Sequence, residues 1–224
     1  VQEILGQSGG RFSVRFHRET AGRTAELAGR WLAHFHCWPV EGPCEPYDIP
    51  VRAKWCETNL AYLESHGLPA AEADEVRRLL ARVQGKSVRD IAVTIHGDFK
   101  PSNLMVSEGA VIGIDMEGYH RGHPLIDVGQ FLVHASLTRS SSMWGMGPAA
   151  WWSHLARRFL VGYRAVADWD LGGVDFRLMD ATLAVLANLA SRNPGLLWRL
   201  RGRDIMVRMV RQALKAASKE VVGG

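Results

Sequence analysis

Two short polar segments lie between apolar runs in the middle of this chain. The first is His-Gly-Asp-Phe-Lys-Pro-Ser-Asn, residues 96–103, which follows the apolar run 91–95. The second is Asp115, which ends the apolar run 111–114. Short apolar runs bounded by turn residues are typical of strands. A further run at 104–106 is separated from the last one by a Glu-Gly pair, which favours a hairpin turn. The pattern therefore predicts a strand, a polar loop and a hairpin that brings Asp115 beside that loop.

The spacing of these polar residues favours phosphoryl transfer from a nucleotide. That reaction needs one carboxylate to orient or deprotonate the attacking hydroxyl, and oxygen ligands for Mg²⁺. Asp98 supplies the first, and Asn103 and Asp115 supply the second. Lys100 adds a cation where the transferring phosphoryl group concentrates negative charge. Asp and Asn are also common in turns, but their joint occurrence with His96 between two strands outweighs that simpler interpretation.

The same residues carry a resemblance to a known family. Residues 96–103 resemble the H-G-D-x-x-x-x-N catalytic loop of the aminoglycoside phosphotransferase and choline kinase-like family. Residues 114–117 (Ile-Asp-Met-Glu) and 122–128 (Gly-His-Pro-Leu-Ile-Asp-Val) are similar to that family's I-D-W-E and G-x-P-x-x-D-L. The loop is also similar to the protein kinase pattern H-R-D-L-K-P-x-N. In that pattern Gly97 replaces the Arg that reads activation-loop phosphorylation, which favours a small-molecule kinase.

The resemblance implies a role for each polar residue of these segments. Asp98 becomes the catalytic base, or the group that positions the hydroxyl, and Lys100 the residue that contacts the γ-phosphate. Asn103 and Asp115 become Mg²⁺ ligands, with His96 and Asp127 as structural support. Asp127 has two interpretations, which are compatible with each other. It braces the catalytic loop, or it lies in the first turn of a helix, where the helix dipole favours an Asp.

The resemblance covers the larger lobe of a two-lobed fold. The Gly-rich loop and strand Lys of the smaller lobe have no convincing counterpart, because residues 6–10 do not fit G-x-G-x-x-G. Residues 1–19 align with the hinge, as a linker remnant of a missing N-lobe, so backbone groups of Glu3, Ile4 and Leu5 are expected to bind the adenine of ATP. Residues 20–224 form the kinase-like C-lobe, which comprises a catalytic loop at 96–103, a metal-binding segment at 112–118 and substrate-side helices over 149–218.

Apolar spacing at i, i+3 and i+4 predicts that most of the chain is helical. The expected helices are 20–38, 51–66, 69–84, 123–137, 149–168, 174–192 and 203–218, with a Pro-containing loop at 39–50. The fold class is therefore α/β in the α+β sense and mainly helical. It is the protein-kinase-like C-terminal lobe, with a small β-hairpin carrying the catalytic loop and the N-lobe apparently absent.

Composition limits the partners and the compartment. No apolar run reaches the roughly 18 residues that span a bilayer, and the three Cys form no CxxC, so we expect a cytoplasmic protein without a membrane partner. Residues 1–139 hold 15 Lys/Arg and 17 Asp/Glu, whereas residues 140–224 hold 12 and 6. A solvated helix face explains this basic region better than nucleic acid, because no groove-binding motif accompanies it. The charge also disfavours a polycationic aminoglycoside as acceptor.

The sequence thus predicts an ATP-dependent phosphotransferase that passes the γ-phosphoryl group to a hydroxyl of a small molecule, with ATP and Mg²⁺ as cofactors. This fragment alone is expected to grip ATP poorly. Two alternatives stay open: a non-catalytic kinase-like binding module, and a protein kinase-like enzyme. The first predicts no turnover even by the full gene product, and the second predicts protein substrates.

Overall fold

The computed structural model describes residues 18–39, 41–45, 47–83, 91–107, 109–116, 118–140, 149–169, 171, 173–192 and 196–218. The helices in this part of the chain are α2 (Arg18–His36), α3 (Ile49–Ser65), α4 (Ala70–Val83), α5 (Leu125–Ser140), α6 (Ala149–Arg164), α7 (Val174–Arg192) and α8 (Leu196–Ser218). The strands are β1 (Cys44–Glu45), β2 (Val93–Ile95), β3 (Leu104–Ser107), β4 (Ala110–Gly113) and β5 (His120–Gly122). A short 3₁₀ turn, η1 (Pro101–Asn103), precedes β3.

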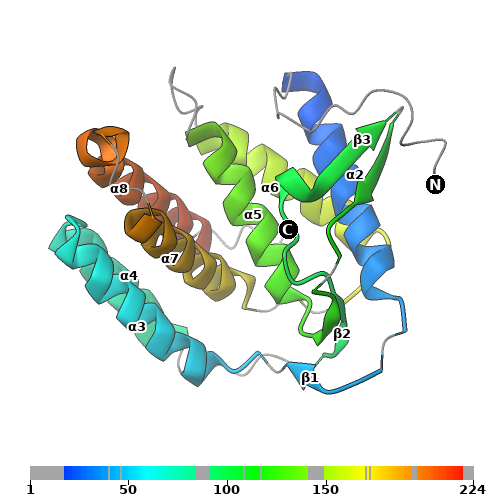
Figure 1. Cartoon of the computed structure of the whole chain (residues 1–224), viewed down its shortest axis with the longest axis horizontal. Coiled ribbons are helices and arrows are strands. Elements are labelled where there is room, and N and C mark those ends of the chain that lie inside the picture. The colour runs from blue at the N-terminus through cyan, green and yellow to red at the C-terminus, as the bar shows by residue number, and fades with distance from the viewer. Residues whose placement is uncertain are drawn as a thin grey trace.

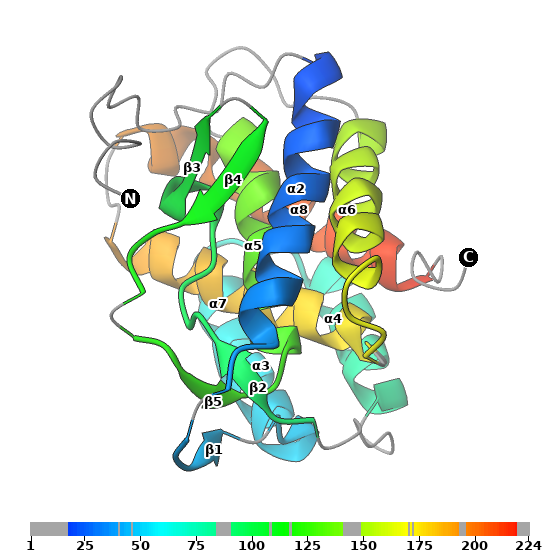
Figure 2. The same cartoon turned by 90° about the vertical axis from the view of Figure 1, so that its right-hand side faces the viewer.

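The helices form two groups with α5 between them. On one side α2 and α6 lie side by side, and the β3–β4 hairpin packs against α2 (Figure 2). On the other side α3, α4, α7 and α8 pack together, and α7 contacts α5 (Figure 1). This arrangement places the hairpin, the start of α5 and the end of α2 around one region, where the polar segments lie.

Two glycines allow α2 and α6 to approach closely. A Cβ added at Gly29 would come within 2.1 Å of the carbonyl oxygen of Phe159, and one at Gly162 within 1.9 Å of that of Glu26. These contacts are with backbone atoms, which cannot rotate away as a side chain does. The close pairing of α2 with α6 therefore depends on the absence of side chains at both positions.

The strands form two small sheets. In the first, β5 lies between β1 and β2, parallel to β1 and antiparallel to β2, with Ile95 opposite His120. In the second, β3 and β4 form an antiparallel hairpin in which Leu104 lies opposite Gly113. The chain leaves β2 at Ile95, passes through the polar loop and η1, and enters the hairpin. Each polar segment therefore begins where a strand ends.

Phe99 anchors the polar loop in the core. Its side chain is fully buried, and its ring stacks on Trp31 with centroids 5.7 Å apart and packs against Phe131 at 5.5 Å. Burial of a Phe side chain contributes roughly 1.5–3 kcal/mol. The neighbours of Phe99 in the chain, Asp98 and Lys100, are only partly buried. One apolar residue thus anchors a loop in which Asp98 and Lys100 stay accessible to solvent.

The mainly helical class and the hairpin are confirmed. The expected helices agree with the structure to within a few residues, except that α8 begins at Leu196 rather than at 203. Strands β1 and β5 were not expected, and β1 interrupts the segment predicted as a loop. The proposed hinge at Glu3, Ile4 and Leu5 lies outside the described residues. No helix of the described part is both long and apolar enough to cross a membrane.

Candidate active site

Three side chains hold the carboxylate of Asp98. The amide of Gln130, on α5, donates to Oδ1 at 2.7 Å. The amide of Asn103 donates to Oδ2 at 3.0 Å, and the ammonium of Lys100 contacts the same oxygen. The Asp98 side chain is nevertheless 42% exposed. The carboxylate is therefore fixed in direction by neighbours and still open to a molecule arriving from solvent.

Asn103 is oriented by contacts that leave its oxygen free of Asp98. Its Nδ2 donates to the backbone carbonyl of Asp98 at 3.0 Å as well as to the carboxylate. A carbonyl oxygen only accepts hydrogen bonds, so the nitrogen of the side-chain amide must face it. The opposite atom, Oδ1, then faces away from Asp98, and its one described contact is the Ser102 hydroxyl at 3.4 Å.

Asp115 is held beside the loop through its neighbour Ile114. The N–H of Ile114 donates to the carbonyl of Asn103 at 2.9 Å, and the ring of His96 donates from Nε2 to the carbonyl of Ile114 at 3.0 Å. Asp115 itself is exposed and has a φ of 66°, the one positive value at a non-glycine residue in the described part. Such a conformation is uncommon and concentrates at functional sites.

His96 supports the loop from within the core. The ring is buried among Trp31, Phe35 and Phe99, and its Nδ1 has no hydrogen-bond partner in the structure described here. Because Nε2 faces a carbonyl oxygen, it must carry a proton, and a neutral ring then leaves Nδ1 as a lone pair in apolar surroundings. His96 thus ties β2 to the end of β4 and does not reach toward solvent.

Asp127 braces the start of the loop from the first turn of α5. Its fully buried carboxylate accepts hydrogen bonds from the backbone N–H of His96 at 2.6 Å and of Gly97 at 2.9 Å. His36, at the end of α2, approaches the same carboxylate at 3.1 Å through Nε2, and its Nδ1 lies 2.7 Å from the hydroxyl of Tyr163 on α6. Burial and the nearby Asp127 charge raise the pKa of Tyr163, so its hydroxyl keeps a proton to donate.

A buried arginine fixes the turn that carries Asp127. Arg177, on α7, donates to the backbone carbonyls of Leu125 at 3.3 Å and Ile126 at 3.2 Å. The remaining side of its guanidinium pairs with Asp180 at 2.6 Å. This charge-assisted network joins α7 to the first turn of α5, and through Asp127 to the polar loop of residues 96–103.

Gly97 occupies a position that a side chain would strain. Its φ is +81°, and an added Cβ would lie 3.2 Å from the carbonyl oxygen of Gly118 and 3.6 Å from the ring of His120. Positive φ favours glycine. The protein kinase Arg at this position therefore has no place here without movement of the 118–120 segment.

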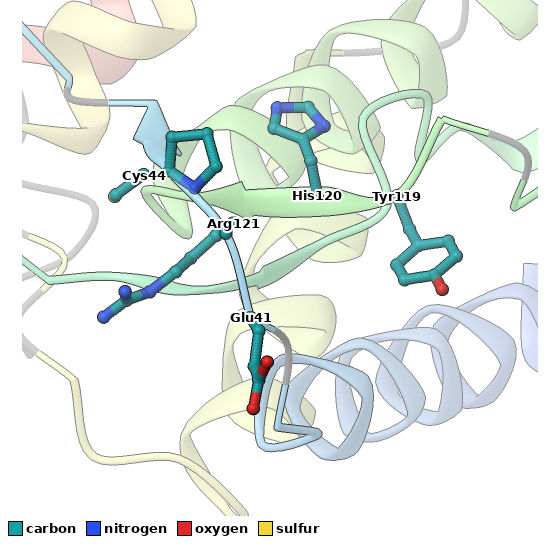
Figure 3. A pocket seen from close by; sticks show the side chains of 7 residues that line it. Glu41, Cys44, Tyr119, His120 and Arg121 are labelled. Atoms are coloured by element: carbon teal, nitrogen blue, oxygen red, sulfur yellow. The ribbon is translucent and has the colours of Figure 1, made fainter.

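A surface hollow of about 480 Å³ is lined in part by residues 119–121. Figure 3 shows its lining, which includes His120 and Arg121 of β5, the preceding Tyr119, Cys44 of β1, and Glu41 in the loop before β1. None of the residues around the Asp98 carboxylate lines this hollow. It is therefore separate from the polar cluster, although His120 lies next to Gly97.

The structure thus gathers six of the residues singled out from the sequence, which are His96, Asp98, Lys100, Asn103, Asp115 and Asp127. Lys100 contacts the Asp98 carboxylate in this structure. Sequence reasoning missed Gln130, His36 and Tyr163. Gln130 lies three residues after Asp127 on a predicted helix, a spacing that puts both on adjoining faces and was the available signal.

Comparison with known proteins identifies the family of this chain. Residues 2–172 match the phosphotransferase enzyme family, APH. Because the match covers well over half of the chain, the chain belongs to this family. The comparison with curated proteins gives no match.

Several solved structures are similar to this chain. A complex of amicoumacin kinase with AMP-PNP, Ca²⁺ and Ami has 14% identity and a TM-score of 0.53, over 87% of this chain and 59% of that one. Spectinomycin phosphotransferase with ADP and spectinomycin has 16% identity and a TM-score of 0.54, over 95% and 69%. Glucosamine kinase with glucosamine, ADP and inorganic phosphate has 16% and 0.52, over 90% and 54%.

These likenesses establish the fold. The chain has the kinase-like fold of this phosphotransferase family, as its sequence predicted. It spans about 59% of the length of amicoumacin kinase and 54% of that of glucosamine kinase.

Proposed function

We propose that this chain is the larger lobe of an ATP-dependent kinase that phosphorylates a hydroxyl group of a small molecule. The observation that carries the proposal is the Asp98 carboxylate, fixed at both oxygens by Gln130 and Asn103 and still open to solvent. Membership of the phosphotransferase family supports the reaction class.

In the proposed reaction Asp98 receives the proton of the acceptor hydroxyl. The O–H bond breaks as the hydroxyl oxygen forms a bond to the γ-phosphorus, and the bond from that phosphorus to the β–γ bridging oxygen breaks to release ADP. Catalysis of this kind depends on positioning and on charge stabilisation. Lys100 contacts the Asp98 carboxylate. Among the residues described around that carboxylate, it provides the positive charge for the transferring phosphoryl group.

The residues beside Asp98 fit a Mg²⁺ ion. Mg²⁺ prefers hard oxygen ligands and is held by one or two protein groups together with phosphate oxygens and water. Oδ1 of Asn103 faces away from Asp98, and Asp115 is exposed next to Ile114, which is hydrogen-bonded to Asn103. No cluster of three His, Cys, Asp or Glu exists in the described part, which agrees with a shared protein–phosphate site. Asn103 and Asp115 would hold the ion, which would neutralise phosphate charge.

The exposed face of the hairpin suits the nucleotide. Met105 and Ile112 lie opposite each other in the β3–β4 register, and Ile114 follows on the same face. Ile112 and Ile114 are each 38% exposed, although both are large and apolar. Because Ile112 and Ile114 lie near Asp115, an adenine ring on this apolar surface would leave the phosphates of the nucleotide near the proposed metal ligands. Amicoumacin kinase and spectinomycin phosphotransferase, which have a similar fold, were solved with AMP-PNP and ADP respectively, which supports nucleotide binding but not its place.

The cysteines bear on the proposed compartment. Cys37, Cys44 and Cys56 form no disulfide within the described part of the chain, which suits a reducing environment. We place the protein in the cytoplasm, where ATP and Mg²⁺ are available.

Steady-state ADP release by the full gene product tests the function. The protein is incubated with ATP, Mg²⁺ and a panel of hydroxyl compounds that includes glucose, glucosamine, choline and spectinomycin, and separately with mixed proteins. ADP release that depends on a small acceptor supports the proposal. If the full gene product shows no turnover of ATP with any acceptor, the result supports the non-catalytic module. If it transfers phosphate only to proteins, the result supports the protein kinase-like alternative.

A further inference from the structure

The site-facing side of α5 is marked by two residues one helical turn apart. From Leu125 to Ala135, every residue except Gln130 and His134 is buried. Residues four apart lie on the same face of a helix. Both residues interact with the pair Asp98 and Lys100. Gln130 donates a hydrogen bond to Asp98. The pKa of His134 is lowered first by burial and next by the charge of Lys100, whereas the charge of Asp98 raises it. This face of α5 therefore forms one wall of the region around the Asp98 carboxylate.

The hydrogen bonds distinguish the two oxygens of Asp98. An ionised carboxylate oxygen has about two lone-pair sites. Oδ2 already receives Asn103 and contacts Lys100, which occupies both of its sites. Oδ1 receives only Gln130 among the described residues, so it keeps one site for an incoming donor.

We propose that Gln130 is a positioning residue that makes Oδ1 of Asp98 the atom that takes the proton from the acceptor hydroxyl. The proposal rests on the proposed function. Gln130 holds Oδ1 at 2.7 Å, which limits rotation of the carboxylate and leaves one lone-pair site of Oδ1 for the acceptor hydroxyl.

Two substitutions separate positioning from a structural role. In Gln130→Ala the carboxylate loses its fixed direction, and we expect kcat to fall roughly 10- to 100-fold, because small misplacements of reacting groups cost up to about 100-fold. The KM for ATP should stay within about two-fold, since Gln130 contacts the base and not the metal ligands. Gln130→Glu keeps the shape, but at pH 8 it presents a carboxylate to Asp98 and should be at least as slow as Gln130→Ala.

The pH dependence of the Gln130→Glu variant is the sharper measurement. As the pH falls toward 6, a fraction of the introduced side chains near Asp98 becomes protonated, because two close carboxylates share a proton, and donation to Oδ1 returns. The activity of this variant relative to wild type should therefore rise on acidification, which a packing defect does not produce. Gln212→Ala is the matched control, because Gln212 lies on α8, which packs on α4 and α7. The activity of this control should keep a constant ratio to wild type as the pH falls.

All variants are made in the full gene product and assayed by ADP release with an acceptor that the wild type uses. Wild-type turnover together with a Gln130→Ala kcat within two-fold of wild type overturns this inference and leaves the proposed function intact. A Gln130→Glu activity that keeps a constant ratio to wild type from pH 6 to 8 also overturns it. A wild type that neither binds nor turns over ATP overturns the proposed function and this inference together.

Discussion

Nε2 of His36 lies 3.1 Å from the carboxylate of Asp127, although 91 residues separate them in the chain. The pair joins the end of α2 to the first turn of α5, and the same carboxylate receives the backbone of His96 and Gly97. The loop that carries Asp98 is therefore held by a buried charge, and the consequences for stability can be measured.

Asp127→Ala should lower the free energy of unfolding by about 3–5 kcal/mol, because removal of one partner of a buried pair leaves polar groups without partners. Two backbone N–H groups and the His36 ring lose their acceptor. Urea unfolding measures the effect. Asp74→Ala is the matched control, since Asp74 is 60% exposed beside Arg77, and such pairs contribute about 0–1 kcal/mol. Equal losses in the two variants would contradict the bracing role.

Tyr163→Phe should cost about 1–3 kcal/mol of unfolding free energy, because it leaves the buried Nδ1 of His36 without its partner. The hydroxyl is the described partner of His36 Nδ1, and the ring itself stays packed in the variant. Denaturant unfolding with an unchanged m-value would show that only stability has moved. A variant as stable as the wild type would mean that His36 does not need this partner.

Gly97→Ala should destabilise the protein more than Gly109→Ala. Both glycines have similar positive φ values, +81° and +86°, so both substitutions meet the left-handed backbone cost of about 1–2 kcal/mol. At Gly97 the new Cβ also crowds the carbonyl oxygen of Gly118 at 3.2 Å, whereas at Gly109 it meets only the end of Arg23. Thermal unfolding measures the stability of both variants. Equal losses of stability would show that residues 118–120 move away from the new Cβ without measurable cost.

The lowered pKa of His134 predicts a stability that falls in acid. Burial first, and the Lys100 charge next, hold this pKa below the ordinary value, with Asp98 acting against them. The unfolded chain therefore binds the proton more readily, and the contribution is complete above a pH of about 6.5 and lost as the pH falls below it. In His134→Gln this part of the slope should vanish. Urea unfolding from pH 5 to 8 tests the difference, and parallel curves would contradict it.

Much of this site could be predicted because its chemistry is contiguous in the chain. The catalytic loop, the hairpin and Asp115 fall within residues 96–115, and apolar runs mark the strands on either side. Helices were found from their 3.6-residue period. Strands β1 and β5 were missed because two or three residues are too few to show an alternation.

The remaining contacts depend on how separate elements pack. Gln130 meets Asp98 because α5 crosses the loop, and His36 meets Tyr163 because α2 and α6 pack together without side chains at Gly29 and Gly162. Beyond the spacing of Gln130 from Asp127, the sequence alone contains no signal for these pairings. The residues proposed to act directly were therefore predictable from the sequence, together with His96 and Asp127, whereas His36 and Tyr163 were not.

Removal of the metal ligands should change the requirement for Mg²⁺. In the full gene product, Asn103→Ala and Asp115→Ala should each raise the Mg²⁺ concentration needed for half-maximal ADP release at least about tenfold, or abolish turnover, because each removes one oxygen ligand. The exposed Asp168 provides the control, as Asp168→Ala. Wild-type Mg²⁺ dependence in both variants would refute the ligand assignment.

The most direct test of the account is the turnover of Asp98→Asn in the full gene product. This variant keeps the shape of the side chain and removes the proton acceptor, so kcat for acceptor-dependent ADP release should fall roughly 10²- to 10⁴-fold, the typical contribution of a general base. ATP affinity, measured by calorimetry on the same samples, should stay within about two-fold. A kcat within tenfold of wild type would contradict the assignment of Asp98 as the proton acceptor.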